Sequence, residues 1–355
     1  MHAVVISCLG VLVSALQIDG FKMCPYRCSC YDSSHFVDCK RRSLTSIPRD
    51  VPHGTWMLDF RYNNLSEIPT GSFSGLWSAR IVLLARNRIQ RIHSGAFEAL
   101  CFLEKLDLNQ NRIRHLPGDL SDSLQHLIEL RLSNNHIEYI HWNSMQYLEN
   151  LEKLDLSRNR ITSLETGAFK GLYKLRHLFL KNNRLNVIET GFFVMLQSLE
   201  ALHLEHNNIT TIQGEAFASL RSLSLLCLNG NHLNHIKFKT FLNIQTQGTH
   251  LQLADNHWIC DCDLQRVFGK ILSVRHLHVD DYANITCSAP GQLSGQPLVT
   301  VDSQLCIAET ATVLVITGTV LVTVIAAIVM AERNRKKARS KNWNDSDGPF
   351  DSQDK

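Results

Sequence analysis

The sequence predicts a solenoid, with a parallel β-sheet on its concave face and an irregular or 3-10 convex side, followed by one transmembrane helix. The first observation is an asparagine that recurs every 24 residues: Asn63, Asn87, Asn111, Asn135, Asn159, Asn183, Asn207 and Asn231. The second is an apolar frame, with apolar residues three and five positions before each asparagine and two positions after it. The third is a run without charged residues from 311 to 331. A unit this short has too little core of its own, so the units must stack.

The coil around Asn159 illustrates how the frame predicts backbone structure. Leu154 and Leu156 flank Asp155, which is the period-two pattern of a half-buried strand. The chain then turns at Asn159, whose side chain can hydrogen-bond to backbone groups of the bend. A further asparagine, Asn256, follows after 25 residues and extends the pattern by one strand. Nine parallel strands would span roughly 40 Å, enough for a concave face of protein size.

A second recurrent position, ten residues after the asparagine, carries phenylalanine in most coils. We expect these rings to stack as an aromatic spine on the convex side. Ser121 and Met145 occupy the position in two coils, which predicts thinner packing between residues 115 and 150. The spine residues are Phe73, Phe97, Phe169, Phe193, Phe217 and Phe241.

Cysteines flank both ends of the repeats, where a solenoid would otherwise expose apolar cross-sections. The two sets are Cys24, Cys28, Cys30 and Cys39 upstream and Cys260, Cys262, Cys287 and Cys306 downstream. Four cysteines allow three connectivities, and the residues alone leave all three open. A zinc site is the other use of such a set, but zinc sites favour a C-x2-C spacing and the chain has the features of a secreted protein.

The frame L-x-x-L-x-L-x-x-N-x-L resembles the leucine-rich repeat, and both cysteine sets resemble the flanking modules of extracellular leucine-rich repeat proteins. The resemblance implies an α/β-type leucine-rich repeat solenoid with a cysteine-rich N-cap over 21–54, eight 24-residue units over 55–249 and a cysteine-rich C-cap over 250–308. The disulfides that it implies are Cys24–Cys30, Cys28–Cys39, Cys260–Cys287 and Cys262–Cys306. His257 stands where the family commonly has proline, and this departure leaves the assignment unchanged.

Two apolar segments predict the topology. The run from Val4 to Leu16 is typical of a signal peptide, which we place over residues 1–20. The segment 310–331 is long enough for a membrane helix of about 20 residues. A buried soluble helix is the alternative, which the β-branched composition disfavours. The basic cluster that follows places the tail, 332–355, in the cytosol. The sequence thus predicts a single-pass type I protein of the plasma membrane with an extracellular N-terminus.

Composition and motifs narrow the classes of function. The net charge is +3, from 36 Lys and Arg against 33 Asp and Glu, and part of that excess lies beside the predicted span. We therefore expect no nucleic-acid partner. The sequence has no H-E-x-x-H, P-loop or G-x-S-x-G motif, so we expect no enzyme and no cofactor. Three sequons predict N-glycosylation at Asn64, Asn208 and Asn284.

The residues six, four and two positions before each asparagine should face outward from the concave sheet. In the middle coils these positions carry mixed charges, which we expect to neutralise one another across strands. Apolar patches rimmed by polar groups often mark interaction sites. The candidate ligand-binding residues are Ile81 and Leu83 in one area and His177, Phe179, His203 and Leu225 in another. Shielding by a neighbour is the other interpretation of each position, because single exposed apolar residues are normal.

Two cysteines lie within the repeats. Cys227 falls between two leucines of a predicted strand, so it should face outward from the concave sheet, whereas Cys101 should lie on the convex side. The two should not reach each other, which leaves unpaired or modified thiols, or thiols that pair between molecules. Histidines of neighbouring coils raise a metal hypothesis, but no carboxylate or cysteine completes a compact spacing, so we predict no metal site. These histidines are His177, His203, His206 and His250.

Two classes of function remain. In the first, the chain is a receptor or cell-adhesion protein that binds an extracellular or membrane protein. In the second, it is an auxiliary subunit of a membrane ion channel, because similar proteins that modulate potassium channels share the short tail and the basic cluster. Those proteins have fewer repeats. A row of small residues in the span, Thr319, Thr323 and Ala327, leaves a homo-oligomer open.

Overall fold

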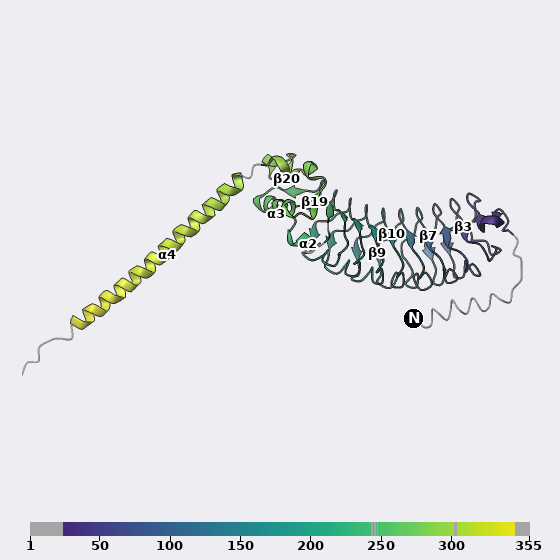
Figure 1. Ribbon diagram of the computed structural model, residues 1–355, viewed down its shortest axis with the longest axis horizontal. Coiled ribbons are helices and arrows are strands. Elements are labelled where there is room, and N and C mark those ends of the chain that lie inside the picture. Colours follow the sequence, from purple (N-terminus) through teal and green to yellow (C-terminus); the bar gives the residue numbers. More distant parts are fainter. Residues whose placement is uncertain (1–23, 243, 245, 247, 302–303, 345–355) are drawn as a thin grey trace, which may run out of the picture. The chain divides into compact units, whose positions relative to one another are not determined.

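The computed structural model describes residues 24–242, 244, 246, 248–301 and 304–344 (Figure 1). The predicted signal peptide, 1–20, and the end of the predicted tail lie outside the described residues. The chain forms two compact units, one that ends at Val301 and one that contains the long helix α4 (Gln304–Asn344).

The first unit is the predicted solenoid, built on one 12-stranded sheet. Neighbouring strands are parallel and pair in a register of one repeat, so that Lys153 lies beside His177. The exception is β1 (Ser29–Tyr31), which is antiparallel to β2. The other strands are β2 (Phe36–Asp38), β3 (Met57–Asp59), β5 (Ile81–Leu83), β7 (Lys105–Asp107), β8 (Glu129–Arg131), β10 (Lys153–Asp155), β12 (His177–Phe179), β14 (Ala201–His203), β16 (Leu225–Cys227), β17 (Thr249–Gln252) and β19 (Leu277–Val279). The sheet therefore extends past the repeats into both caps.

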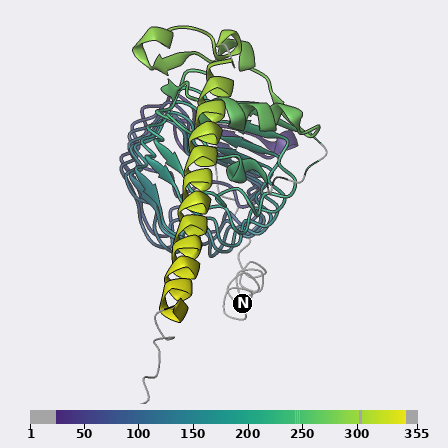
Figure 2. The same ribbon diagram turned by 90° about the vertical axis from the view of Figure 1, so that its left-hand side faces the viewer.

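The convex side is irregular, as predicted, with turns closed by hydrogen bonds between residues three apart and with short strand pairs. These pairs are β4 (Glu67–Ile68) with β6 (Arg91–Ile92), β9 (Tyr139–Ile140) with β11 (Ser163–Leu164), β13 (Val187–Ile188) with β15 (Thr211–Ile212), and β18 (Trp258–Ile259) with β20 (Cys287–Ala289). Figure 2 shows the coils superimposed along the stack, with the strands on one side and the turns on the other.

The predicted aromatic spine forms and is buried. Phe169 and Phe193 stack with ring centroids 6.3 Å apart, and Phe193 stacks on Phe217 at 6.1 Å. Ser121 and Met145, which interrupt the spine, are also fully buried. A hydroxyl and a thioether thus fill the interior in those two coils, and the backbone N–H of Tyr147 donates to the Ser121 hydroxyl.

The recurrent asparagine connects each coil to the coil that precedes it. The Asn159 amide donates to the carbonyl oxygens of Leu132 and Leu156 at 3.0 and 2.9 Å, and its oxygen accepts from the Ile137 N–H at 3.0 Å. The same pattern recurs from Asn87 to Asn256. Buried backbone groups of each bend are satisfied in this way, as interiors require.

The residue before each recurrent asparagine has a left-handed backbone, with φ between 53° and 59° at the non-glycine positions from Tyr62 to Asp255. Non-glycine residues adopt this region uncommonly. Glycine fills the position once, at Gly230, where a Cβ would clash with the imidazole of His206. The turn is therefore held by the stack rather than by local residue preference.

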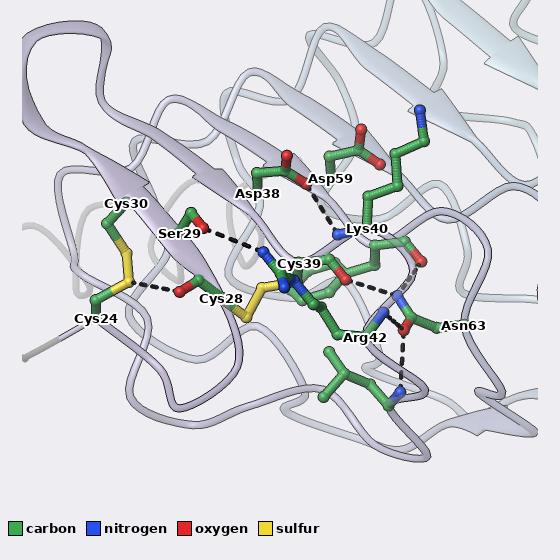
Figure 3. Close-up of a disulfide and its surroundings, with 12 residues drawn as sticks. Cys24, Cys28, Ser29, Cys30, Asp38, Cys39, Lys40, Arg42, Asp59 and Asn63 are labelled. Carbon is green, nitrogen blue, oxygen red and sulfur yellow. Dashed lines mark hydrogen bonds between the residues drawn. A yellow bond between two sulfur atoms is a disulfide. The ribbon is translucent and has the colours of Figure 1, made fainter.

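At the N-terminal end, disulfides join Cys24 to Cys30 and Cys28 to Cys39, as the resemblance implied (Figure 3). Asn63 continues the ladder into this cap, since its amide donates to the Cys39 carbonyl at 2.9 Å and its oxygen accepts from the Arg42 N–H at 3.0 Å. A 3-10 turn, η1 (Asp32–Ser34), connects β1 and β2.

At the C-terminal end, the amphipathic helix α3 (Cys262–Ser273) covers the last coil. Asp261 caps it by accepting from the Leu264 N–H. Trp258 is fully buried against Phe268 and donates to the Leu253 carbonyl at 3.0 Å. The other short elements here are α2 (Lys239–Leu242), η2 (Tyr282–Asn284), η3 (Gly291–Leu293) and η4 (Leu298–Thr300).

The predicted Cys260–Cys287 bridge forms. Cys262 and Cys306 are each disulfide-bonded as well, as the fourth implied bridge requires. Cys101 is also disulfide-bonded, so of the alternatives left open by the sequence the unpaired thiol does not hold for this residue. The repeat position of Cys101 predicted the side of the solenoid on which it lies, but not what its sulfur meets. Among the described cysteines, Cys227 has a free thiol.

The second unit contains α4, whose stretch Val313–Lys337 is long and apolar enough to cross a membrane and is unburied. The helix begins before the predicted span of 310–331 and continues through the basic cluster that follows it. Together with the disulfides, this helix gives the architecture of a single-pass membrane protein with an extracellular repeat domain.

Candidate interaction surface

The concave face carries three neighbouring groups of side chains, and the first is a charged network on the middle strands. Glu129 on β8 lies 2.7 Å from Lys105 and 2.6 Å from Arg131, and its other neighbour, Lys153, is 3.7 Å away. Burial raises the pKa of Glu129, but the contacts with Lys105 and Arg131 outweigh it and hold that pKa below its usual value. The charges are therefore matched across strands, as the sequence predicted.

At Asp107, on the neighbouring strand β7, the effect of burial on the pKa outweighs that of the neighbouring charges. Asp107 is 8% exposed, and its carboxylate accepts from the Asn109 N–H at 3.0 Å. Burial raises the pKa of Asp107, and the charges of Arg131 and Lys105 compensate only in part.

The second group is an aromatic cluster formed by His177, Phe179 and His203, which we call the Phe179 cluster. Phe179 pairs with His203 across β12 and β14, and the two rings stack with centroids 4.6 Å apart. His177 also stacks with Phe179, with ring centroids 6.5 Å apart, and the Lys153 ammonium lies 5.6 Å from the Phe179 ring centroid. A cation over an aromatic face is attracted by the ring quadrupole. These three residues of the predicted contact area therefore lie side by side.

Leu225 lies two strands from His177, with Ala201 between them in the same register row. His177, Phe179, His203 and Leu225 are half-buried rather than fully exposed. Adjacent strands lie about 4.8 Å apart, so neighbouring side chains cover part of each other. The cluster is consequently a partly shielded surface with the Phe179 ring at its centre.

The predicted area around Ile81 and Leu83 differs from the expectation. Ile81 is half-buried, but Leu83 is only 6% exposed. Leu83 lies between Asp59 and Asp107 of the flanking strands, and these neighbours cover it. The exposure on which this second candidate area rested is therefore absent at Leu83.

The third group was missed in the sequence. The side chains of His203, Glu205 and Cys227 place potential metal-binding atoms within 4.8 Å of one another. The expectation that no carboxylate or cysteine completes a compact spacing with these histidines therefore does not hold at His203. His203 and Cys227 are 24 residues apart and directly adjacent in the sheet. Aligning the sequence by repeat puts them side by side, and this signal could have revealed the group.

The electrostatics of this group reflect its burial. Cys227 faces the concave side but is only 3% exposed, because flanking side chains cover it. Burial, assisted by the Glu205 charge, raises the pKa of the Cys227 thiol to about 12. Burial also raises the pKa of Glu205, but contact with His203 and the charge of Lys181 outweigh it and lower that pKa overall. The thiol is therefore neutral at physiological pH and a weak nucleophile.

The glycosylation candidates Asn64, Asn208 and Asn284 are all exposed. Asn64 and Asn208 each follow a recurrent asparagine, so both lie at the edge of the sheet rather than on the concave face.

The fold and its capped ends define a class of protein, the extracellular repeat solenoid that presents a concave sheet. The Leucine rich repeat family model matches overlapping segments that run from residue 56 to residue 233, half of the chain. The chain belongs to the leucine-rich repeat family.

Curated relatives match short stretches. Rat (Rattus norvegicus) Leucine-rich repeat-containing protein 3 is 39% identical over 69 residues, 19% of this chain and 27% of that protein. Bovine (Bos taurus) Asporin is 38% identical over 66 residues, 19% of this chain and 17% of Asporin. Human Immunoglobulin superfamily member 10 is 36% identical over 87 residues, 24% of this chain and 3% of that protein. The matches thus span about a quarter or less of these relatives.

Solved structures match most of the solenoid. Human 5T4 (Wnt-activated inhibitory factor 1, Trophoblast glycoprotein) aligns with a TM-score of 0.59 at 24% identity, covering 79% of this chain and 97% of that one. A chain of the octameric complex of Latrophilin 3, Unc5D and FLRT2 aligns with a TM-score of 0.52 at 23% identity, covering 79% and 98%. At these identities the likeness shows the shared fold.

Proposed function

We propose that this chain is a receptor or adhesion protein of the plasma membrane whose concave face binds an extracellular protein. The observation that carries the proposal is the Phe179 cluster, an aromatic ring stacked with two histidines beside the paired charges of the middle strands. Aromatic residues are enriched among the hot spots that contribute most of the binding free energy in protein interfaces. The leucine-rich repeat family and its paired-charge sheet favour a binding role over an enzymatic one.

The binding surface is tested by replacing Phe179 and Leu225 with serine in the full-length chain. Proximity labelling and crosslinking on living cells should recover an extracellular partner with the native chain and lose most of it with the double variant. Truncating a binding hot spot costs about 2 kcal/mol or more, roughly a 30-fold loss of affinity. Tyr173→Ser is the matched control, because Tyr173 is 51% exposed and lies in a turn on the convex side. Equal recovery with the double variant and the native chain would exclude this surface.

The alternative, an auxiliary subunit of an ion channel such as a potassium channel, places the function in the membrane segment. A chain in which 311–341 is exchanged for an unrelated span separates the two. Recovery of the same extracellular partner with both chains supports the solenoid as the recognition element. Recovery of a polytopic channel only with the native span would replace the receptor proposal with the channel-subunit proposal.

A further inference from the structure

Strands β14 and β16 bring together three side chains that carry nitrogen, oxygen and sulfur donors. His203 ends β14, and Cys227 is its register partner at the end of β16. Glu205 follows His203 by two residues, so its side chain extends on the same face. The His203 Nδ1 lies 3.4 Å from the Glu205 Oε1, and one donor atom from each of the three residues lies within 4.8 Å of the others.

Several buried polar atoms at this place lack a hydrogen-bond partner among the described residues. The Nδ1 of His203 and the Oε2 of Glu205 are buried and make no hydrogen bond. The Oδ1 of Asn229, which occupies the position of Glu205 in the next repeat, is buried without a hydrogen bond as well. The Cys227 thiol beside them is free and 97% buried, the complement of its 3% exposure. Buried polar atoms normally have partners, so such exceptions require an explanation.

We propose that His203, Glu205 and Cys227 form a zinc-binding site on the concave face. Zinc accepts imidazole nitrogen, carboxylate oxygen and thiolate sulfur at about 2.0–2.3 Å, which places tetrahedral ligand atoms roughly 3.3–3.8 Å apart. Small side-chain rotations bring the three donors from within 4.8 Å to that spacing. Calcium and magnesium prefer all-oxygen ligand sets, and the sulfur and nitrogen donors select against them.

The surroundings fit this assignment. The His203 ring is held by its stack on Phe179 at 4.6 Å, which limits its rotation and keeps Nδ1 beside Glu205. Zinc binding deprotonates the Cys227 thiol and releases the proton to solvent. Three protein ligands leave a fourth position for water or for a donor from another molecule. Lys181 lies 3.8 Å from Glu205, and its ammonium opposes a cation at the site.

Cobalt(II) absorption of the purified full-length chain in detergent, without reductant, tests the site. A thiolate ligand gives cobalt a sulfur-to-metal charge-transfer band, and zinc should displace the cobalt and remove the band. Cys227→Ser should abolish the band, and Glu205→Gln and His203→Gln should each weaken zinc affinity. These losses should exceed the roughly 10- to 100-fold effect of removing an outer-shell partner. Lys181→Met should strengthen zinc binding, which a purely structural role of these residues does not predict.

His250→Gln is the matched control, because His250 is also a concave histidine beside a carboxylate, Asp280, at 2.7 Å. It should leave the band and the zinc affinity unchanged. Zinc should also raise the Tm of the native chain and of the control, but not that of Cys227→Ser. The proposal is overturned if the native chain shows no charge-transfer band, or if Cys227→Ser retains the band.

Discussion

The recurrent asparagine is the residue on which the repeat depends. Each one satisfies buried backbone groups of its own bend and of the preceding coil, as the three hydrogen bonds of Asn159 illustrate. Other polar side chains of similar size do not supply both an amide donor pair and an acceptor. The apolar residues of the frame exclude water from the bend, so the lost bonds of a variant cannot be replaced by solvent.

Asn159→Ala is expected to lower the free energy of unfolding by about 3 kcal/mol, because it leaves the Ile137 N–H and two carbonyl oxygens with fewer partners in a dry interior. Denaturant unfolding followed by circular dichroism measures this loss. The control is Asn186→Ala, which removes an asparagine that is exposed and lies outside the ladder. Similar losses for the two variants would contradict the role assigned to the ladder.

Strand β8 shows how charge is accommodated on a crowded sheet. Glu129 has three cationic neighbours on its own strand and on β7 and β10, and its side chain is 16% exposed. Single surface ion pairs contribute little, but a shared carboxylate between three cations contributes more because its removal leaves all three repelling one another.

Glu129→Gln should lower stability by about 1 kcal/mol at neutral pH, after discounting for the partly exposed cations. The pKa of Glu129 is lowered in the folded chain, so its stabilising effect is present above the unfolded pKa of about 4.3 and is lost as pH falls through the folded pKa. The difference between the native chain and the variant should therefore shrink in acid. Unfolding curves measured from neutral to acidic pH test this, and a constant difference would refute it.

Asp107 lies on the adjacent strand β7, and its pKa is raised, whereas that of Glu129 is lowered. Burial raises the pKa of Asp107, so its ionisation costs stability that builds up as pH rises from the unfolded pKa towards the folded pKa. Asp107→Asn retains the acceptor for the Asn109 N–H and should be neutral or stabilising at neutral pH. The same unfolding curves measure the stability of Asp107→Asn beside that of Glu129→Gln. If Asp107→Asn lowers the free energy of unfolding as much as Glu129→Gln does, burial is not the dominant effect at Asp107.

At the scale of the whole solenoid, stability depends on the two ends. Each coil contacts its neighbours, so an uncapped end frays and the loss spreads coil by coil. The C-terminal cap closes the stack with Trp258, which is fully buried between the last coil and α3 and contacts Phe268 edge-on.

Trp258→Ala is expected to cost about 3–5 kcal/mol, the usual range for removing a buried aromatic side chain. Hydrogen exchange should show the last coils losing protection before the coils near the N-terminal cap. Trp142, which is 44% exposed, provides the control substitution Trp142→Ala. If all coils lost protection to the same extent, the solenoid would unfold as one cooperative unit rather than fray from its C-terminal end.

Most of the correct predictions rest on the position of a residue within its repeat. The strands, the Phe spine and the grouping of His177, Phe179 and His203 follow from it, because residues one repeat apart lie side by side in a parallel sheet. One prediction failed because it concerned exposure: Leu83 was expected to be exposed and is buried between two aspartates. Cys227 faces outward from the concave sheet as predicted, but it is only 3% exposed. Facing direction follows from sequence parity, whereas exposure depends on neighbouring side-chain size and sheet curvature.

The repeat, the concave and convex faces, the capped ends and the candidate membrane helix follow from the sequence alone, because each depends on periodic or contiguous patterns along the chain. The three-dimensional packing was needed to show that donor atoms of Glu205 and Cys227 lie within 4.8 Å of His203 and that Cys101 is disulfide-bonded. The 24-residue register brings distant residues onto adjacent strands, but side-chain rotamers and burial fix which atoms meet. Those quantities arise from packing and are not written in the local sequence.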